Sequence, residues 1–220
     1  MSKVFIFDVD GTLIDSNEEH AKAWQKAFAS KGKNISLKQI WPHLGKGSDQ
    51  FLPNFLSKDE LKEIGADLDN AHGRIFRSEY LPQIRPFPKV RELFKKIRDA
   101  DGKIALASSS DKKEVEVYET IAQIGDLVEK STSSDDAQKT KPAPDIFQAA
   151  MRNLGNPPKN TVVVIGDTPH DATAARRAGL PVAGVLCGGF SEADLRSHGC
   201  FAVFQDPADI LANLATLLNR

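Results

Sequence analysis

Cysteine is scarce in this chain of 220 residues, and the two that occur, Cys187 and Cys200, are thirteen positions apart. That spacing fits neither a zinc-binding pair nor a redox Cys-x-x-Cys motif. Two free thiols are typical of a protein in a reducing compartment, which argues against a disulfide framework. A chain of this length buries enough surface to fold without disulfides or a structural metal.

Excess charge of one sign and long apolar runs are also missing. Lys and Arg number 29 against 30 Asp and Glu, which leaves a formal net charge of −1. A nucleic-acid-binding protein usually carries a basic excess, so no nucleic-acid partner is expected. No apolar run approaches the roughly 20 residues of a membrane span, and the opening Met-Ser-Lys-Val-Phe-Ile-Phe-Asp does not form a signal peptide. We therefore expect a cytoplasmic protein that is not bound to a membrane.

Short apolar runs alternate with amphipathic segments along most of the chain. Apolar residues spaced three and four apart predict a helix over 90–97 with Gly102 as its C-cap. Similar stripes follow the predicted N-caps Asp145 and Asp206. This alternation is typical of an α/β fold with a largely parallel sheet. The predicted strands are residues 4–7, 104–107, 162–165, 182–186 and 201–204.

The region 15–86 interrupts the alternation. It contains helical patterns, such as the apolar stripe over 23–28, but no convincing strand, and it closes on a proline cluster at 82–88. We predict that 15–86 is a helical insert. The rest of the chain, 1–14 and 87–220, would then form one discontinuous core.

Polar side chains follow the predicted strands at their carboxyl ends, where open α/β sheets bind ligands. Alone, each such segment is more often an ordinary turn, a helix cap or a surface lysine. Their joint order along one chain argues against coincidence, because all of them can converge on one edge of the sheet. The segments are Asp8-Val-Asp-Gly-Thr, Ser108-Ser-Ser, Lys141-Pro and Gly166-Asp-Thr-Pro-His-Asp171.

The carboxylates at this edge predict a divalent cation. Four aspartates in one crevice would repel one another, and a cation together with Lys141 would relieve that repulsion. A ligand set made only of oxygen suits Mg²⁺ rather than zinc, and the five histidines are scattered without ligand spacing. Mg²⁺ is therefore the predicted cofactor, with ligands drawn from Asp8, Asp10, Asp167 and Asp171.

The Asp8-x-Asp10 pair predicts nucleophilic catalysis on phosphorus. Residues i and i+2 of an extended strand face the same way, so one carboxylate can attack while the other handles the leaving-group proton. Ser108, its neighbour Ser109 and nearby backbone amides are candidates to hold the phosphoryl oxygens. Lys141 would offset the charge that develops on those oxygens.

Four motifs in this order resemble those of the haloacid dehalogenase-like hydrolase superfamily. They are Asp8-Val-Asp-Gly-Thr-Leu, Ala107-Ser108, Lys141-Pro-x-Pro-Asp and Gly166-Asp-Thr-x-x-Asp171. The resemblance covers the whole chain and is closest to the phosphoglycolate phosphatase-like branch, with the β-phosphoglucomutase-like branch beside it. It implies a Rossmann-like, doubly wound parallel sheet with an inserted helical cap over 15–86.

The resemblance also implies catalytic roles. Asp8 would be the nucleophile and a Mg²⁺ ligand. Asp10 would be the general acid and base, and would ligate the metal through its backbone carbonyl. Ser108 would bind the phosphoryl group. Lys141 would stabilise the nucleophile, and the Pro-x-Pro-Asp context favours it over Lys139 for that role.

The fourth motif and the cap would supply the remaining site residues. Asp167 would ligate Mg²⁺ directly, with Asp171 in support or as a further ligand. The cap segment Leu-Gly-Lys-Gly-Ser-Asp looks like the family's substrate-specificity loop. Gly45, Lys46 and Ser48 are therefore expected to face the substrate, with Lys46 available to an anionic leaving group. A solvated turn with a surface lysine stays the alternative.

The resemblance favours a Mg²⁺-dependent phosphomonoesterase that hydrolyses a small organic phosphate, phosphoglycolate- or sugar-phosphate-like, through an aspartyl-phosphate on Asp8. Dehalogenase members of the superfamily lack an acid like Asp10 two residues after the nucleophile. Mutase-like members carry Glu-Asp in the fourth motif, where this chain has Gly166-Asp167. A phosphosugar mutase stays an alternative. So does a phospho-acceptor signalling domain, although the insert and Asp10 argue against it. The expected partner is a small-molecule substrate, and the expected state is a monomer or a weak homodimer.

Overall fold

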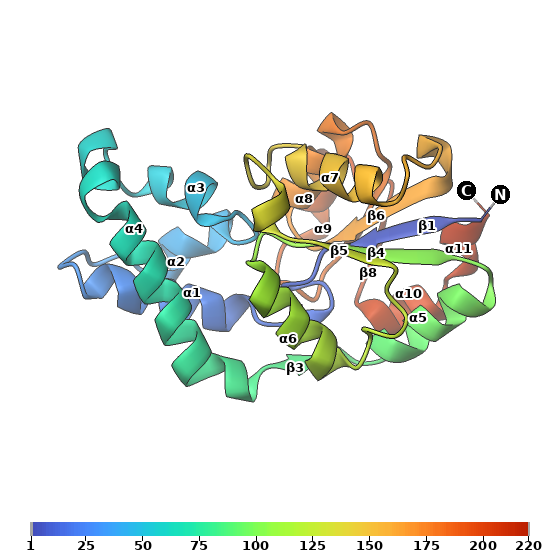
Figure 1. Ribbon diagram of the computed structural model, residues 1–220, viewed down its shortest axis with the longest axis horizontal. Coiled ribbons are helices and arrows are strands. Elements are labelled where there is room, and N and C mark those ends of the chain that lie inside the picture. Colours follow the sequence, from blue (N-terminus) through green and yellow to red (C-terminus); the bar gives the residue numbers. More distant parts are fainter. Residues whose placement is uncertain (1, 220) are drawn as a thin grey trace.

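The computed structural model describes residues 2–219, and its centre is a six-stranded parallel sheet with the order β5-β4-β1-β6-β7-β8 (Figure 1). From the central β1 the chain reaches β4 and β5 on one side and β6, β7 and β8 on the other. This reversal leaves a crevice beyond the carboxyl ends of the middle strands. The strands are β1 (Val4–Phe7), β4 (Lys103–Ala107), β5 (Lys130–Thr132), β6 (Val162–Gly166), β7 (Val182–Val185) and β8 (Ala202–Phe204).

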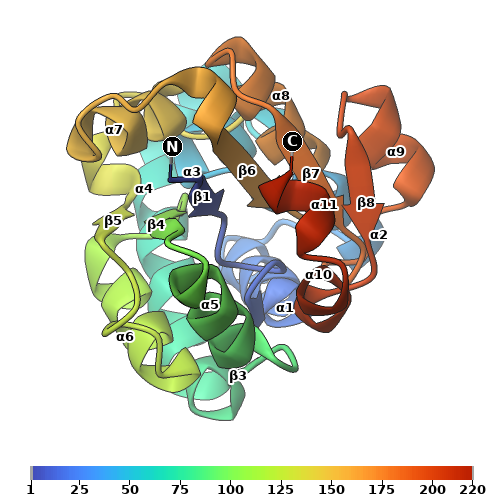
Figure 2. The ribbon, with the colours of Figure 1, turned by 90° about the vertical axis from the view of Figure 1, so that its right-hand side faces the viewer.

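Helices cover both faces of the sheet, as the predicted doubly wound fold requires (Figures 1 and 2). Alternate residues of β1 point to opposite faces, so Phe5 and Phe7 enter one apolar core and Val4 and Ile6 the other. The first core is closed by α5 (Val90–Asp99), α6 (Lys112–Ala122), α10 (Pro207–Ala212) and α11 (Ala215–Leu218). The second is closed by α7 (Asp145–Asn153), α8 (Pro169–Arg177) and α9 (Glu192–Ser197).

The five predicted strands are present, with shifts of a residue or so at their ends. The sixth strand, β5, was not predicted. Its residues Lys-Ser-Thr are polar, and only Thr132 is buried, because β5 lies at the edge of the sheet and pairs only with β4. An edge strand of this kind has no apolar run that would mark it in the sequence.

Two predicted helix ends are wrong. After α5 the left-handed conformation falls on Asp101, with φ 57°, and not on Gly102. Asp145 is the first helical residue of α7 rather than its N-cap. The predicted N-cap Asp206 is confirmed, since its carboxylate accepts a hydrogen bond from the backbone N–H of Asp209 at 2.9 Å. Within residues 2–219, no helix combines the length and the apolar character needed to cross a bilayer.

The segment between β1 and α5 forms a helical cap at one end of the sheet, opposite the chain termini (Figures 1 and 2). Its α-helices are α1 (Asn17–Ala29), α2 (Leu37–Ile40), α3 (Ser48–Phe51) and α4 (Lys58–Ile75). A π-helical turn follows at Phe76–Tyr80. The cap's short 3-10 turns are Trp41–His43, Leu52–Asn54 and Leu81–Gln83, and those of the core are Ser134–Asp136 and Lys159–Thr161.

An antiparallel ribbon joins the cap to the core. It consists of β2 (Ile14–Asp15) and β3 (Arg85–Pro86), with Ile14 opposite Pro86. The expectation of no strand in 15–86 is therefore wrong at both edges, because two-residue strands carry no periodicity. The domain boundaries at 14/15 and 86/87 stay a prediction; β2 spans the first, and β3 ends at the second.

The N-terminus of α4 allows a test of cap stability. The Ser57 hydroxyl accepts from the N–H of Glu60 at 3.3 Å, and the Glu60 carboxylate accepts from the N–H of Ser57 at 2.8 Å. Ser57→Ala should remove about 1 kcal/mol of unfolding free energy and lower Tm by about 2–4 °C. Ser78→Ala is the control, because that hydroxyl only donates to the Ile75 carbonyl within a helix. Equal losses in the two variants, measured by denaturant titration, would contradict the capping role.

Candidate active site

The chain brings its predicted site residues to the carboxyl ends of three neighbouring strands. Asp8 directly follows β1, and its N–H continues the ladder to the carbonyl of Ile165 at 2.8 Å. Ser108 follows β4, and Asp167 follows β6. Because the ladder extends to the first residue beyond β1, the nucleophile candidate is held by the rigid sheet rather than by a loop.

A buried ion cluster lies at the centre of this edge. Lys141 has no exposed surface, and its ammonium contacts Asp8 Oδ1, Asp171 Oδ1 at 2.8 Å and the carbonyl of Ala107 at 2.9 Å. Burial acts to lower the pKa of Lys141, but the two carboxylates outweigh it and hold the pKa above its ordinary value. The lysine therefore stays charged. Lys139, the competing candidate, is exposed.

Asp8 and Asp167 share a single hydroxyl donor. The Thr12 hydroxyl lies 3.0 Å from a carboxylate oxygen of each, and Asn17 donates to the second oxygen of Asp167 at 2.8 Å. Burial is the main factor that raises the pKa of both aspartates, to about 7 for Asp8. A Cβ at position 188 would lie 1.8 Å from an oxygen of Asp167, so the close approach of that loop requires glycine.

The donor set here fits Mg²⁺. Asp8, Asp167 and Asp171 each place a carboxylate oxygen within 4.8 Å of the others. All three groups are hard oxygen donors. After burial, the charge of neighbouring carboxylates raises the pKa values of Asp8 and Asp167, and a cation would neutralise that charge. Asp171 is already engaged, since its Oδ2 accepts from the N–H and the hydroxyl of Thr168 at 3.1 and 2.5 Å. That capping box orients its other oxygen toward Lys141.

Asp10 belongs to a separate hydrogen-bond network. Its Oδ1 accepts from the Ser16 hydroxyl at 2.6 Å and lies 3.1 Å from His20 Nε2, while its Oδ2 accepts from the Ser110 hydroxyl at 2.9 Å. Burial would raise the pKa of Asp10, but His20 and the hydroxyl donors outweigh it, so the pKa lies well below its ordinary range. β1 ends at Phe7, so the strand periodicity from which Asp8 and Asp10 were predicted to face the same way does not extend to them.

His20 was not predicted as a site residue, although it connects the cap to Asp10. Its ring stacks on Phe76 with centroids 3.8 Å apart and lies 3.2 Å from His72 and 3.0 Å from the Tyr118 hydroxyl. Burial lowers the pKa of His20, but Asp10 and then Glu114 raise it above its ordinary value. The available signal was a polar stripe, Asn17 and His20, on the buried face of α1.

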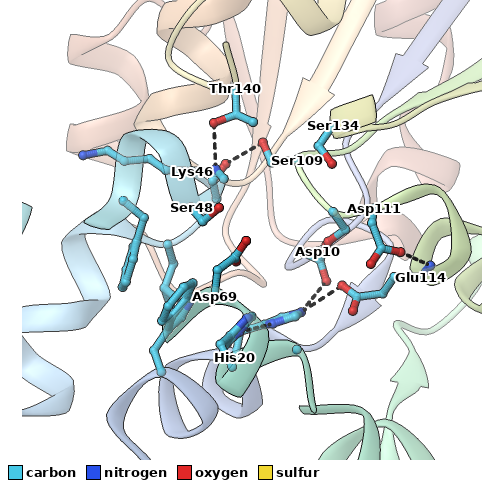
Figure 3. A pocket seen from close by; sticks show the side chains of 18 of the residues that line it. Asp10, His20, Lys46, Ser48, Asp69, Ser109, Asp111, Glu114, Ser134 and Thr140 are labelled. Atoms are coloured by element: carbon cyan, nitrogen blue, oxygen red, sulfur yellow. Dashed lines mark hydrogen bonds and ion pairs between the residues drawn. The ribbon is translucent and has the colours of Figure 1, made fainter. Parts of the chain in front are cut away.

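A cavity of about 240 Å³ lies between the cap and the core, and Gly45, Lys46, Ser48 and Ser109 are among the residues that line it (Figure 3). Ser109 donates to the Gly45 carbonyl at 3.1 Å. The Lys46 side chain extends away from Asp10 (Figure 3). Its amine lies 2.9 Å from His43 Nδ1. The roles of these residues stay predictions.

Ser108 differs from its neighbour in exposure. Its side chain is fully buried, and its hydroxyl accepts a hydrogen bond from the N–H of Ser110 at 3.0 Å. That bond turns the loop after β4 back toward Asp10, since the Ser110 hydroxyl is the donor to Asp10. Ser109 therefore lines the cavity, Ser108 is buried, and Ser110 connects the loop to Asp10.

Comparison with known proteins agrees with this arrangement. The family model of the haloacid dehalogenase-like hydrolases matches residues 2–179. The chain belongs to this family. Among solved structures, a hydrolase from Pseudomonas syringae superposes on this haloacid dehalogenase-like hydrolase with a TM-score of 0.89 at 26% identity, over 98% of this chain and 99% of the other.

Two curated relatives resemble this haloacid dehalogenase-like hydrolase over most of its length. A phosphoglycolate phosphatase of Aquifex aeolicus is 27% identical over 84% of this chain and 85% of its own. The chloroplastic protein SUPPRESSOR OF QUENCHING 1 of Arabidopsis thaliana is 31% identical over 94% of this chain, which spans only 20% of that protein.

The raised pKa values predict how pH affects stability in the absence of metal. Burial and the charge of Asp171 raise the pKa of Asp8 from 3.8 to about 7, against the opposing effect of Lys141. The folded state therefore holds this proton more tightly than the unfolded state, so stability falls as pH rises through that interval. In EDTA, Tm should be higher at pH 5.5 than at pH 8.

The variant Asp8→Asn removes this titration and should reduce the Tm difference. Asp167, whose pKa is also raised, leaves a remainder. Saturating Mg²⁺ should reduce the difference as well, because a bound cation favours the ionised carboxylates. A higher Tm at pH 8 than at pH 5.5 in EDTA would contradict the assignment.

Proposed function

We propose that this hydrolase is a Mg²⁺-dependent phosphomonoesterase that acts on a small organic phosphate, phosphoglycolate- or sugar-phosphate-like. The observation that carries the proposal is the separation of Asp8 and Asp10 into two networks below one cap-covered cavity. Asp8 is paired with a buried ammonium, as suits a nucleophile, whereas Asp10 contacts a protonatable histidine, as suits an acid and base. The resemblance to a phosphoglycolate phosphatase supports the same reaction class.

In the first half-reaction, a carboxylate oxygen of Asp8 attacks phosphorus and the bond to the leaving oxygen breaks. The leaving oxygen takes a proton from Asp10. Because the pKa of His20 is raised and that of Asp10 is lowered, the pair stores this proton on His20 Nε2, which lies 3.1 Å from Asp10 Oδ1. The proton then passes through Asp10 to the leaving group.

In the second half-reaction, water attacks the phosphorus of the Asp8 phosphate and the bond between phosphorus and Asp8 breaks. Asp10 accepts a proton from that water, which returns the Asp10–His20 pair to its initial protonation state. Ser108, Ser109 and backbone amides hold the phosphoryl oxygens, and Lys141 offsets their charge. The products are inorganic phosphate and the ionised Asp8.

Asp8 and Asp167 would hold the metal with the backbone carbonyl of Asp10. Asp171 acts in support, because Thr168 and Lys141 already occupy its carboxylate. A bound Mg²⁺ supplies positive charge that offsets the carboxylates and the phosphoryl group. The raised pKa values of Asp8 and Asp167 support this role.

The cap would select the substrate. Gly45, Lys46 and Ser48 line the cavity and are proposed to contact the leaving group, for which the Lys46 amine must leave His43. Exclusion of bulk water by the cap favours transfer between Asp8 and the phosphoryl group. We propose a cytoplasmic enzyme that works as a monomer or a weak homodimer on a small-molecule substrate.

The first test is phosphate release from a panel of esters that contains phosphoglycolate, sugar phosphates and a chromogenic aryl phosphate. Release should require Mg²⁺ and stop in EDTA. Asp8→Asn should lower turnover by at least about 10⁴-fold without unfolding the protein, because it removes the nucleophile. The matched control is Asp67→Asn, since Asp67 is an exposed cap residue that pairs only with Lys31 among the ion pairs described.

The outcomes separate the rival functions. Near-normal turnover of Asp8→Asn would contradict the mechanism. Transfer of phosphate between positions of a sugar, with little release, would favour a phosphosugar mutase. Phosphorylation of Asp8 that stops at one equivalent would favour a phospho-acceptor signalling domain.

A further inference from the structure

The cap loop, residues 42–49, forms hydrogen bonds with three core residues along the edge of the cavity, namely Ser109, Thr140 and His170. Ser109 donates to the Gly45 carbonyl, and His170 Nε2 lies 2.9 Å from the Pro42 carbonyl. Both contacts end on the backbone of the cap loop, so they do not depend on its side chains. The third contact, with Thr140, uses a cap side chain.

Thr140 is held by the cap loop through three hydrogen bonds. Its backbone N–H donates to Asp49 Oδ2 at 3.2 Å, and its hydroxyl donates to Asp49 Oδ1. The same hydroxyl accepts from the N–H of Gly47 at 3.0 Å. A Cβ at position 47 would lie 2.4 Å from the Thr140 methyl group, so this approach requires glycine. Asp49 itself is exposed, whereas Thr140 is buried.

The neighbour of Thr140 in the chain is Lys141, the ammonium of the buried ion cluster. Residues 138–140 belong to neither a helix nor a strand, and regular structure resumes only with α7 at Asp145. The backbone that carries Lys141 is therefore not fixed by the sheet, unlike that of Asp8. The Asp49 contact holds this backbone from the cap side, one residue from the catalytic lysine.

We propose that Asp49 is a positioning residue that places Lys141 against Asp8 by holding Thr140 while the cap covers the cavity. Closure of the cap and placement of Lys141 are then one event, because Asp49 belongs to the cap and holds the residue next to Lys141. The effect on turnover rests on the function proposed above. The effect on the placement of Lys141 does not.

The first experiment measures the placement of Lys141 without any substrate. The metal-free protein is treated briefly with acetic anhydride, and acetylation of Lys141 is compared by peptide mass spectrometry with that of the exposed Lys139 in the same molecule. Asp49→Ala, Thr140→Val and Gly47→Ala should each raise the ratio by at least about 5-fold, since the lysine leaves its buried position. Thr140→Ser keeps the hydroxyl and should leave the ratio unchanged.

Two control variants separate this role from cap opening and from charge. His170→Ala removes another contact of the cap loop, to the Pro42 carbonyl, without touching Thr140. Asp67→Ala removes an exposed carboxylate elsewhere on the cap. Both should leave the ratio at the wild-type value. An unchanged ratio in Asp49→Ala, or an equal rise in His170→Ala, would overturn the proposal.

The second experiment measures kcat and KM for the chromogenic ester with Mg²⁺. Asp49→Ala and Thr140→Val should each lower kcat by about 10-fold or more, with KM changed less than about 2-fold, because a displaced Lys141 affects the reacting centre. The double variant should be no slower than the slower single variant, since both remove the same contact. Additive losses, or a rise in KM with kcat unchanged, would overturn the positioning role.

Failure of the proposed function is distinguishable from failure of this inference. If the wild-type protein releases no phosphate from any ester, the phosphatase proposal fails. The acetylation ratios still decide whether Asp49 places Lys141.

Discussion

A lysine with no exposed surface, Lys141, is the constraint on which the rest of the site depends. An unpaired ammonium in such a place is too unfavourable to persist, so the protein must bring it compensating oxygens. They come from the ends of separate elements, namely Asp8 after β1, Ala107 at the end of β4 and Asp171 in the first turn of α8. The order of the strands, with β1 between β4 and β6, makes this meeting possible. In return, the ammonium offsets the repulsion between Asp8 and Asp171.

Two carboxylates two positions apart acquire opposite properties from their surroundings. Asp8 is buried beside other acids, and its pKa is raised, whereas Asp10 contacts His20 from the cap, and its pKa is lowered. The core alone supplies the partners of Asp8, while the environment of Asp10 is complete only with the cap in place. The opposite pKa shifts of the two residues therefore depend on different parts of the chain, the core for Asp8 and the cap with the core for Asp10.

The sequence predicted what has a local pattern. Apolar runs marked β1, β4, β6, β7 and β8, and residues that follow strands marked Asp8, Ser108 and Asp167. The polar edge strand β5 and the two-residue strands β2 and β3 have no such pattern. His20, Tyr118 and Glu114 meet only because α1 of the cap approaches α6 of the core, an event that no local spacing encodes. The contact of the Lys46 amine with His43 is likewise not marked by any local pattern, and the expected contact of Lys46 with an anion stays a prediction.

The ribbon of β2 and β3 bears on how such a chain can diversify. Because Ile14 is opposite Pro86, the two ends of the cap leave the core side by side. The ribbon holds the two ends of the cap together. The length of the cap therefore adds little to the loop-closure entropy that opposes pairing of β1 with β4. A longer, shorter or differently folded insert between the same two strands would leave the register of the sheet unchanged. The ribbon therefore lets natural selection alter the cap that covers the cavity without disturbing the pairing of the strands that carry Asp8, Ser108 and Asp167.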